Sequence, residues 1–236
     1  FVAATYLRGV EVVHVPTTLL GAVDASIGGK AGVNLGGKNL VGVFHLPSRV
    51  VIDTEILAAL PERLRRDGLA EALKAGLIGD PDLVDLLESQ GTGAAVDEVV
   101  RRAVAVKAAI VAEDPTDRGR RAHLNYGHTI GHAVELASPL THGEAVAVGM
   151  VAAGAAAAGL LGFDAQVRQR SVIEALGLPT TAPGADPEEV RRLLVLDKKR
   201  DPSGLRMVLL RRVGEPELVR VGPATVDVAL AAVGIA

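Results

Sequence analysis

Residues 125–144 read NYGHTIGHAVELASPLTHGE and contain three of the six histidines in the chain. His128 and His132 are four residues apart, so in a helix their imidazoles project from the same face. The segment Ser138-Pro139-Leu140-Thr141 should end that helix and place His142 at the start of the next one. We therefore expect two helices joined by a short loop, with three imidazoles close together.

This pattern is compatible with a metal site, although an HxxxH pair alone also occurs as capped or core histidines. Other polar residues nearby favour a functional site, because a purely structural helix seldom needs so many polar groups. They are Arg121, Asn125, Glu135 and Glu144. The chain has no cysteine, which leaves His, Asp and Glu as strong metal ligands and fits a cytoplasmic protein.

The composition predicts a globular protein with an aliphatic core. Of the 236 residues 49% are hydrophobic but only 2% are aromatic, so closely packed helices are favoured over a sandwich of sheets. The net charge is −3 without a long basic run, which argues against a nucleic-acid partner. Residues 145–163 carry no charge, but Ala, Gly and Val insert weakly into bilayers, so we expect a buried helix there.

The first sixty residues carry the signals of strands and turns. Residues 10–15 and 50–53 predict short strands, and Thr17-Thr18 can cap a helix over residues 19–27. Two Gly-Gly-Lys turns follow, at residues 28–30 and 36–39. Such turns let backbone N–H groups and lysines approach a phosphate, although a single one is more often only a turn, and the GxxxxGK[ST] order of a P-loop is absent.

After residue 60 the spacing of apolar residues is helical. It predicts helices over residues 61–77, 80–88, 95–113, 166–176 and 188–196, and a hairpin of residues 207–213 and 217–221. In the first of these helices Glu71 and Lys74 are three apart, which taken alone predicts a surface ion pair. Lys107 follows Val106 at the edge of an apolar stripe, which predicts a lysine that reaches out to solvent.

Together these motifs resemble the 3-dehydroquinate synthase family, the NAD-dependent sugar-phosphate cyclases of the shikimate pathway. The similar strings follow the family's order and cover nearly the whole chain. They are YLRG, VPTTLLGAVDASIGGKAGVN, GGKNLVG, LPERLRRDGLAEALKAGLI, the VKA around Lys107, LNYGHTIGHAVE, HGEAVAVGM and DKK. The resemblance implies an α/β plus all-α fold: the C-terminal part of a Rossmann-like NAD-binding domain over residues 1–60, then a multihelical metal- and substrate-binding domain with a small β-hairpin over residues 61–236.

The family's reaction turns 3-deoxy-D-arabino-heptulosonate 7-phosphate into 3-dehydroquinate and phosphate. NAD oxidises a hydroxyl, phosphate is eliminated, the ketone is reduced again, the ring opens, and an intramolecular aldol reaction closes the carbocycle. The resemblance therefore implies a carbon–oxygen lyase with NAD and a zinc or cobalt ion. It also implies a homodimer that takes a small phosphosugar acid as its substrate, with neither nucleic acid nor membrane as partner.

The resemblance also assigns roles to single residues. Three would be metal ligands: Glu71, His128 and His142. Lys74 would be catalytic, and Lys107, Arg121 and Asn125 would hold the substrate carboxylate. His132 would be a proton relay or phosphate neighbour, although helical spacing alone makes it equivalent to His128. The other residues expected around the phosphate are Lys30, Asn39 and one or both of Lys198 and Lys199, with Arg8 from a neighbouring subunit. Those expected at NAD are Thr17, Thr18, Asp24, Lys30, Lys38, Asn39 and the turn of residues 56–59.

Two departures from the family's pattern lead to further expectations. The chain begins where the family would have completed its Gly-rich nucleotide loop, so we expect a truncated piece that is inactive alone. The loop between His132 and His142 is also somewhat short for the family.

Three alternative functions remain open. One is another sugar-phosphate cyclase, acting on sedoheptulose 7-phosphate, an amino analogue or glucose 6-phosphate. The second is an iron-type alcohol dehydrogenase. The third is a non-catalytic helical domain with structural or regulatory histidines.

Overall fold

The N-terminal elements are short and of mixed type. The structure is a computed structural model that describes residues 1–33, 35, 41–200 and 205–235, and for residues 197–200 the backbone alone. The first elements are α1 (Val2–Thr5), the 3-10 turn η1 (Tyr6–Arg8), β1 (Val13–His14), the π-helical turn η2 (Gly21–Ala25), β2 (Lys30–Val33), β3 (Val41–Phe44), β4 (Arg49–Val50) and α2 (Thr54–Ala58).

From Glu62 onward the chain is mostly helical. The elements are α3 (Glu62–Gly79), α4 (Pro81–Gln90), η3 (Gly91–Gly93), α5 (Val96–Glu113), η4 (Arg120–Asn125), α6 (His128–Ala137), α7 (His142–Leu161), α8 (Gln166–Ala175), α9 (Pro187–Arg200), β5 (Arg206–Arg212), β6 (Glu215–Arg220) and α10 (Pro223–Ala231). These bounds confirm the helices and the late hairpin that apolar spacing predicts. Helices α2 and α10 were not predicted.

The strands form three separate pairs. β1 and β4 are parallel, with Val13 opposite Arg49, and are shorter than the two strands predicted there. β2 and β3 form an antiparallel hairpin that the sequence did not predict. It follows the first Gly-Gly-Lys turn, where Gly28 and Gly29 have φ of +95° and +65°, a conformation that favours glycine. The second such turn, residues 36–39, lies wholly outside the described residues.

The predicted cap at residues 17–18 is made by one of the two threonines. The Thr18 hydroxyl accepts a hydrogen bond from Gly21 N at 3.1 Å. The helical segment that follows is brief and ends with η2, and its residues Leu19 and Val23 are buried. This turn brings Asp24 against α3 and α5.

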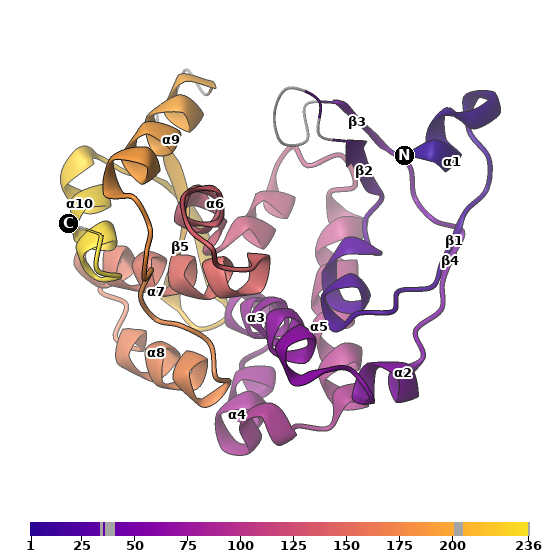
Figure 1. Cartoon of the computed structure of the whole chain (residues 1–236), viewed down its shortest axis with the longest axis horizontal. Coiled ribbons are helices and arrows are strands. Elements are labelled where there is room, and N and C mark those ends of the chain that lie inside the picture. Colours follow the sequence, from indigo (N-terminus) through magenta and orange to yellow (C-terminus); the bar gives the residue numbers. More distant parts are fainter. Residues whose placement is uncertain (34, 36–40, 201–204, 236) are drawn as a thin grey trace.

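Helix α7 is the central element of the helical part and packs against α3, α6, α8, α10 and β5 (Figure 1). By length and composition it could span a membrane, yet 67% of its most apolar stretch is buried inside the molecule. This confirms the predicted buried helix. Its glycines permit close crossing of α6, because a Cβ at Gly149 would overlap the Gly127 carbonyl oxygen.

The arrangement of the elements brings three helices to one place. Figure 1 shows the N-terminal strands on one side of the molecule and α9 and α10 on the other, with α3, α6 and α7 between them. The core is aliphatic, as predicted: among the described residues only Tyr126 and Phe163 are fully buried aromatics. The start of α6, the start of α7 and the middle of α3 meet in this central region.

Candidate metal centre

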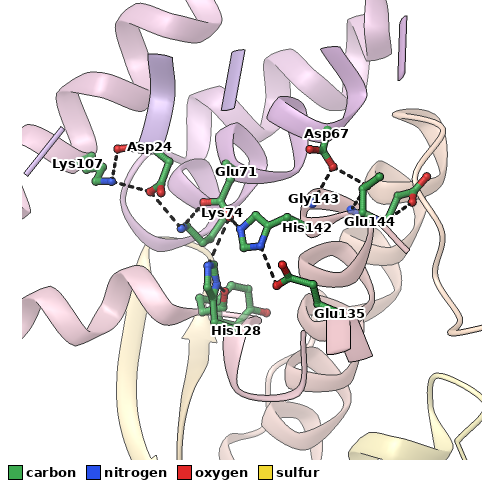
Figure 2. Close-up of polar contacts among 12 residues, drawn as sticks. Asp24, Asp67, Glu71, Lys74, Lys107, His128, Glu135, His142, Gly143 and Glu144 are labelled. Carbon is green, nitrogen blue, oxygen red and sulfur yellow. Dashed lines mark hydrogen bonds and ion pairs between the residues drawn. The ribbon is translucent and has the colours of Figure 1, made fainter. Parts of the chain in front are cut away.

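Three side chains from different helices converge in the centre of the molecule. Glu71 lies in the middle of α3, and His128 and His142 are the first residues of α6 and α7 (Figure 2). Glu71 Oε1 is 3.5 Å from His128 Nε2 and 3.4 Å from His142 Nε2. Neighbouring ligands of a tetrahedral zinc ion with bonds of about 2.1 Å lie about 3.4 Å apart. The three atoms therefore have the spacing of ligands to one ion.

The surroundings of Glu71 also fit a cation. The residue is 2% exposed, and within the described residues no hydrogen bond of good geometry reaches either carboxylate oxygen. Lys74 forms an ion pair with it. Since a buried carboxylate needs partners for both oxygens, the free coordination capacity beside the two imidazoles suits a divalent ion. This donor set of one oxygen and two nitrogens is one that zinc accepts.

The hydrogen bonds of the two histidines orient their rings. His128 Nδ1 lies 3.1 Å from the Tyr126 carbonyl oxygen, which can only accept, so Nδ1 carries the proton and Nε2 presents its lone pair. His142 Nδ1 lies 3.1 Å from Glu135 Oε2, while its Nε2 faces Glu71. A carboxylate on the far nitrogen of a ligating imidazole is the usual arrangement at zinc.

His132 is close to these residues but is placed differently. Its ring centroid is 5.0 Å from that of His128 and 6.2 Å from that of His142. It belongs to a second group of possible ligands, with Glu135 and His142. The structure thus distinguishes two histidines that helical spacing makes equivalent, because only His128 shares a group with Glu71.

Two lysines and an aspartate lie beside the metal group. Lys74 is 3% exposed and lies 3.7 Å from Asp24 Oδ1, in addition to its ion pair with Glu71. Lys107 is 6% exposed, and its Nζ donates to Asp24 Oδ1 at 2.6 Å and to the Asp24 carbonyl at 2.5 Å. Both expectations for these lysines were wrong: neither the surface ion pair nor the solvent-reaching lysine exists, because α5 and η2 cover this part of α3.

The charges of this cluster hold one another in their ionised forms. Burial alone would raise the pKa of Glu71, but Lys74 and His128 outweigh it and leave that pKa well below the usual range. The pKa of Asp24 is also lowered, because Lys74 and Lys107 outweigh the rise that burial alone would cause. Burial is also the largest single influence on the pKa of each lysine, and it acts to lower that pKa. The two carboxylates overcome it at Lys74, whose pKa is raised, but at Lys107 burial prevails and the pKa is lowered.

The two histidines respond in opposite directions. Burial, aided by repulsion from Lys74, lowers the pKa of His128 to about 4, so its imidazole is neutral at pH 7. The neighbouring carboxylates of Glu135 and Glu71 raise the pKa of His142 to about 9. Without an ion, His142 is therefore charged at neutral pH and bridges two carboxylates.

The guanidinium of Arg121 is already engaged with the backbone. It is 2% exposed, and its Nη1 and Nη2 donate to the carbonyls of Pro115 and Gly28 at 2.8 and 2.7 Å. Its charge lies 5.6 Å from the centroid of the Phe44 ring. A carboxylate could take both terminal nitrogens only if these backbone bonds were exchanged.

The other predicted site residues are not part of the buried cluster. Lys30 is exposed and pairs with Asp117 at 2.5 Å. Asn125, Thr17 and Arg8 are exposed as well. Of the remaining ones, Lys38 and Asn39 lie outside the described residues, as do the side chains of Lys198 and Lys199.

The structure gives specific contacts to two further carboxylates: Glu135, which the sequence marked only as a nearby polar residue, and Asp67, which it did not single out. Glu135 contacts His142, and Asp67 contacts the start of α7. Helical spacing could have indicated both residues, because each shares a helix face with an expected ligand. Glu135 is seven residues after His128, so the two share a helix face, and Asp67 is one turn before Glu71 on α3.

Comparison with known proteins gives matches along most of the chain. The family described as "3-dehydroquinate synthase N-terminal" matches residues 1–67, and "3-dehydroquinate synthase C-terminal" matches residues 68–200. The 3-dehydroquinate synthase of Saccharopolyspora erythraea is 47% identical over an alignment of 230 positions that covers 92% of this chain and 61% of the relative. That of Corynebacterium pseudotuberculosis is 44% identical over an alignment of 234 positions that covers 95% of this chain and 65% of the relative. The chain thus spans less than two thirds of these relatives.

Two solved structures are similar throughout. One is 2-epi-5-epi-valiolone synthase from Streptomyces hygroscopicus subsp. jinggangensis 5008 with NAD+ and Zn2+ bound: TM-score 0.89, 33% identity, 98% of this chain and 68% of that one. The other is 2-deoxy-scyllo-inosose synthase complexed with carbaglucose-6-phosphate, NAD+ and Co2+. Its TM-score is 0.88 at 32% identity, and the match covers 97% of this chain and 69% of that one. This likeness confirms the predicted fold class, an α/β part and a multihelical part with a small hairpin.

Proposed function

Since the chain belongs to the 3-dehydroquinate synthase family, we propose that the protein converts 3-deoxy-D-arabino-heptulosonate 7-phosphate to 3-dehydroquinate and phosphate. It would act as an NAD- and divalent-metal-dependent carbon–oxygen lyase. The observation that carries this proposal is the convergence of Glu71, His128 and His142 beside two buried lysines.

The metal and the dinucleotide are part of the same proposal. Glu71 Oε1, His128 Nε2 and His142 Nε2 would hold a zinc or cobalt ion, with positions left over for substrate hydroxyls. When bound, the ion would make a substrate hydroxyl more acidic and NAD would accept and return a hydride. Two related cyclases have NAD+ together with Zn2+ or Co2+ bound in their structures, which supports this pair of cofactors.

The buried lysines would bind and orient the substrate. We propose that Lys107, with Arg121 and Asn125, attracts the substrate carboxylate. Arg121 would give up a hydrogen bond to a backbone carbonyl in order to donate to that carboxylate. Lys74 would stabilise negative charge that develops on the substrate beside Glu71. Asp24 contacts both lysines, so it would position them in addition to its expected contact with NAD.

The remaining assignments rest on the family resemblance. His132 would relay a proton beside the phosphate, since it neighbours the metal group without belonging to it. The other phosphate residues would be Lys30, Asn39 and Lys199, and the other NAD residues Thr17, Thr18 and Lys38. We also propose a cytoplasmic location and a homodimer. Size-exclusion chromatography with light scattering would measure the molar mass and so test the homodimer.

A panel of substrates tests the reaction. The purified enzyme that contains this chain together with a complete nucleotide-binding domain, supplied with NAD and Zn2+ or Co2+, should release inorganic phosphate from the seven-carbon phosphosugar acid without net NADH, whereas the 236 residues alone should be inactive. It should release far less from sedoheptulose 7-phosphate or glucose 6-phosphate, which lack the carboxylate. Turnover of those two sugars alone would instead assign one of the other cyclase activities, which the structural likeness to two such enzymes makes the second candidate. Net NADH from a plain polyol would contradict both.

A further inference from the structure

We infer that Asp67 is a positioning residue that fixes the separation of Glu71 and His142. This inference rests on the metal site of the proposed function. Asp67 and Glu71 are four residues apart on α3, so their side chains lie one turn apart on the same face. Asp67 thus connects the helix that carries the carboxylate to the helix that carries His142 (Figure 2).

One oxygen of Asp67 holds the chain on both sides of His142. Asp67 Oδ1 accepts a hydrogen bond from the Thr141 hydroxyl at 2.6 Å and another from Gly143 N at 2.8 Å. Because Thr141 and Gly143 are its two chain neighbours, the backbone of His142 is fixed relative to α3. The direction of its imidazole then depends on few remaining rotations.

The residue type at position 143 permits this close approach. Gly143 is buried, and a Cβ there would overlap the backbone carbonyl and the carboxylate of Asp67. Glycine therefore allows the start of α7 to lie directly against α3. Any larger residue would push the two helices apart, and with them Glu71 and His142.

The cap of α7 reinforces the contact. Thr141 is the N-cap, Glu144 Oε2 accepts from Thr141 N at 2.8 Å, and the Thr141 hydroxyl accepts from Glu144 N at 3.4 Å. The hydroxyl can therefore accept from its own helix while it donates to Asp67. A carboxylate at this end of α7 also suits the positive end of the helix dipole.

The contact should affect the metal site more than the fold. It lies where the start of α7 meets α3, next to His142 and one turn from Glu71, whereas α7 is held along its length by α6, α8, α10 and β5. Loss of Asp67 would let the start of α7 shift by a few tenths of an ångström without unfolding it. A shift of that size is enough to weaken a metal site with fixed bond lengths.

The test is a titration of the purified, metal-free protein with Co2+, followed by the visible absorption of the bound ion and by competition with a chelator. Asp67→Ala should weaken Co2+ binding by about 10- to 100-fold, the usual effect of losing an outer contact of a ligand. It should also change the Co2+ bands, which report coordination geometry. Asp67→Asn retains an acceptor oxygen, so it should recover most of the affinity and the original spectrum.

Control variants separate positioning from general loss of stability. Asp53→Ala removes the aspartate that caps α2, away from the metal group, and should leave Co2+ binding unchanged. Thr141→Val, which removes the donor to Asp67, should weaken binding as Asp67→Ala does, and Thr141→Ser should restore it.

The outcomes also distinguish this inference from the proposed function. If Glu71→Gln loses Co2+ while Asp67→Ala and Thr141→Val bind it normally with an unchanged spectrum, the role of Asp67 is refuted and the metal site stands. If Glu71→Gln binds Co2+ as tightly as the unaltered protein, the ligand set is wrong and the inference falls with it.

Discussion

At the scale of single residues, the partners of the two ring nitrogens determine the role of each histidine. His128 donates through Nδ1 to a backbone carbonyl and offers Nε2, whereas His142 faces Glu71 with one nitrogen and Glu135 with the other. Helical spacing could not reveal this difference, because it places His128 and His132 on the same face. The distinction comes from α3, which brings Glu71 to His128.

Glu135 should strengthen metal binding through His142. Glu135→Gln removes the charge that holds the Nδ1 proton, so zinc affinity should fall by about 10- to 100-fold. Competition with a chelator would measure this change. Glu113→Gln, which alters an exposed ion pair with Arg120, is the matched control and should have no effect. Equal affinities for both variants would refute the role of Glu135.

Metal binding should also release a proton at neutral pH. The pKa of His142 is about 9 before the ion binds, and that of His128 is about 4, so at pH 7 only His142 must lose a proton to coordinate. Because protons compete with the ion below pH 9, the apparent affinity should weaken about tenfold for each unit of pH lost between 9 and 7.

Calorimetric titrations with Zn2+ in two buffers of different ionisation enthalpy would count that proton. The expected count is close to one at pH 7 and falls toward zero above pH 9. Release of no proton at pH 7 would mean that His142 is either neutral beforehand or not a ligand.

At the scale of elements, the crossing of α6 and α7 determines the positions of His128 and His142, the first residues of these helices. Gly149→Ala would place a methyl group on the Gly127 carbonyl oxygen, one residue before His128. Such overpacking costs about 1–3 kcal/mol or more. We therefore expect a lower free energy of unfolding and weaker metal binding together.

Gly159→Ala is the matched control in the same helix. Position 159 is exposed, and no atom lies within 4 Å of a Cβ added there. Alanine is the better helix former by about 1 kcal/mol, so this variant should be more stable than the unaltered protein. Urea unfolding of both variants measures the contrast, and equal stabilities would contradict the packing described for α7.

At the scale of the whole molecule, the sequence predicted the fold better than the environment of individual side chains. Periodicity located the long helices and the late hairpin, since their apolar faces are regular. It missed the β2–β3 hairpin, where glycine and lysine hide the strand signal. It also placed Lys74 and Lys107 at the surface, because burial of both lysines depends on Asp24, which is remote from them in sequence.

The central claim is that Glu71, His128 and His142 hold one divalent ion. Anomalous X-ray scattering from crystals grown with Co2+ or Zn2+ tests it directly. We predict one strong peak about 2.0–2.2 Å from Glu71 Oε1, His128 Nε2 and His142 Nε2. A peak coordinated instead by His132 and Glu135, or no bound ion near Glu71, would contradict the account.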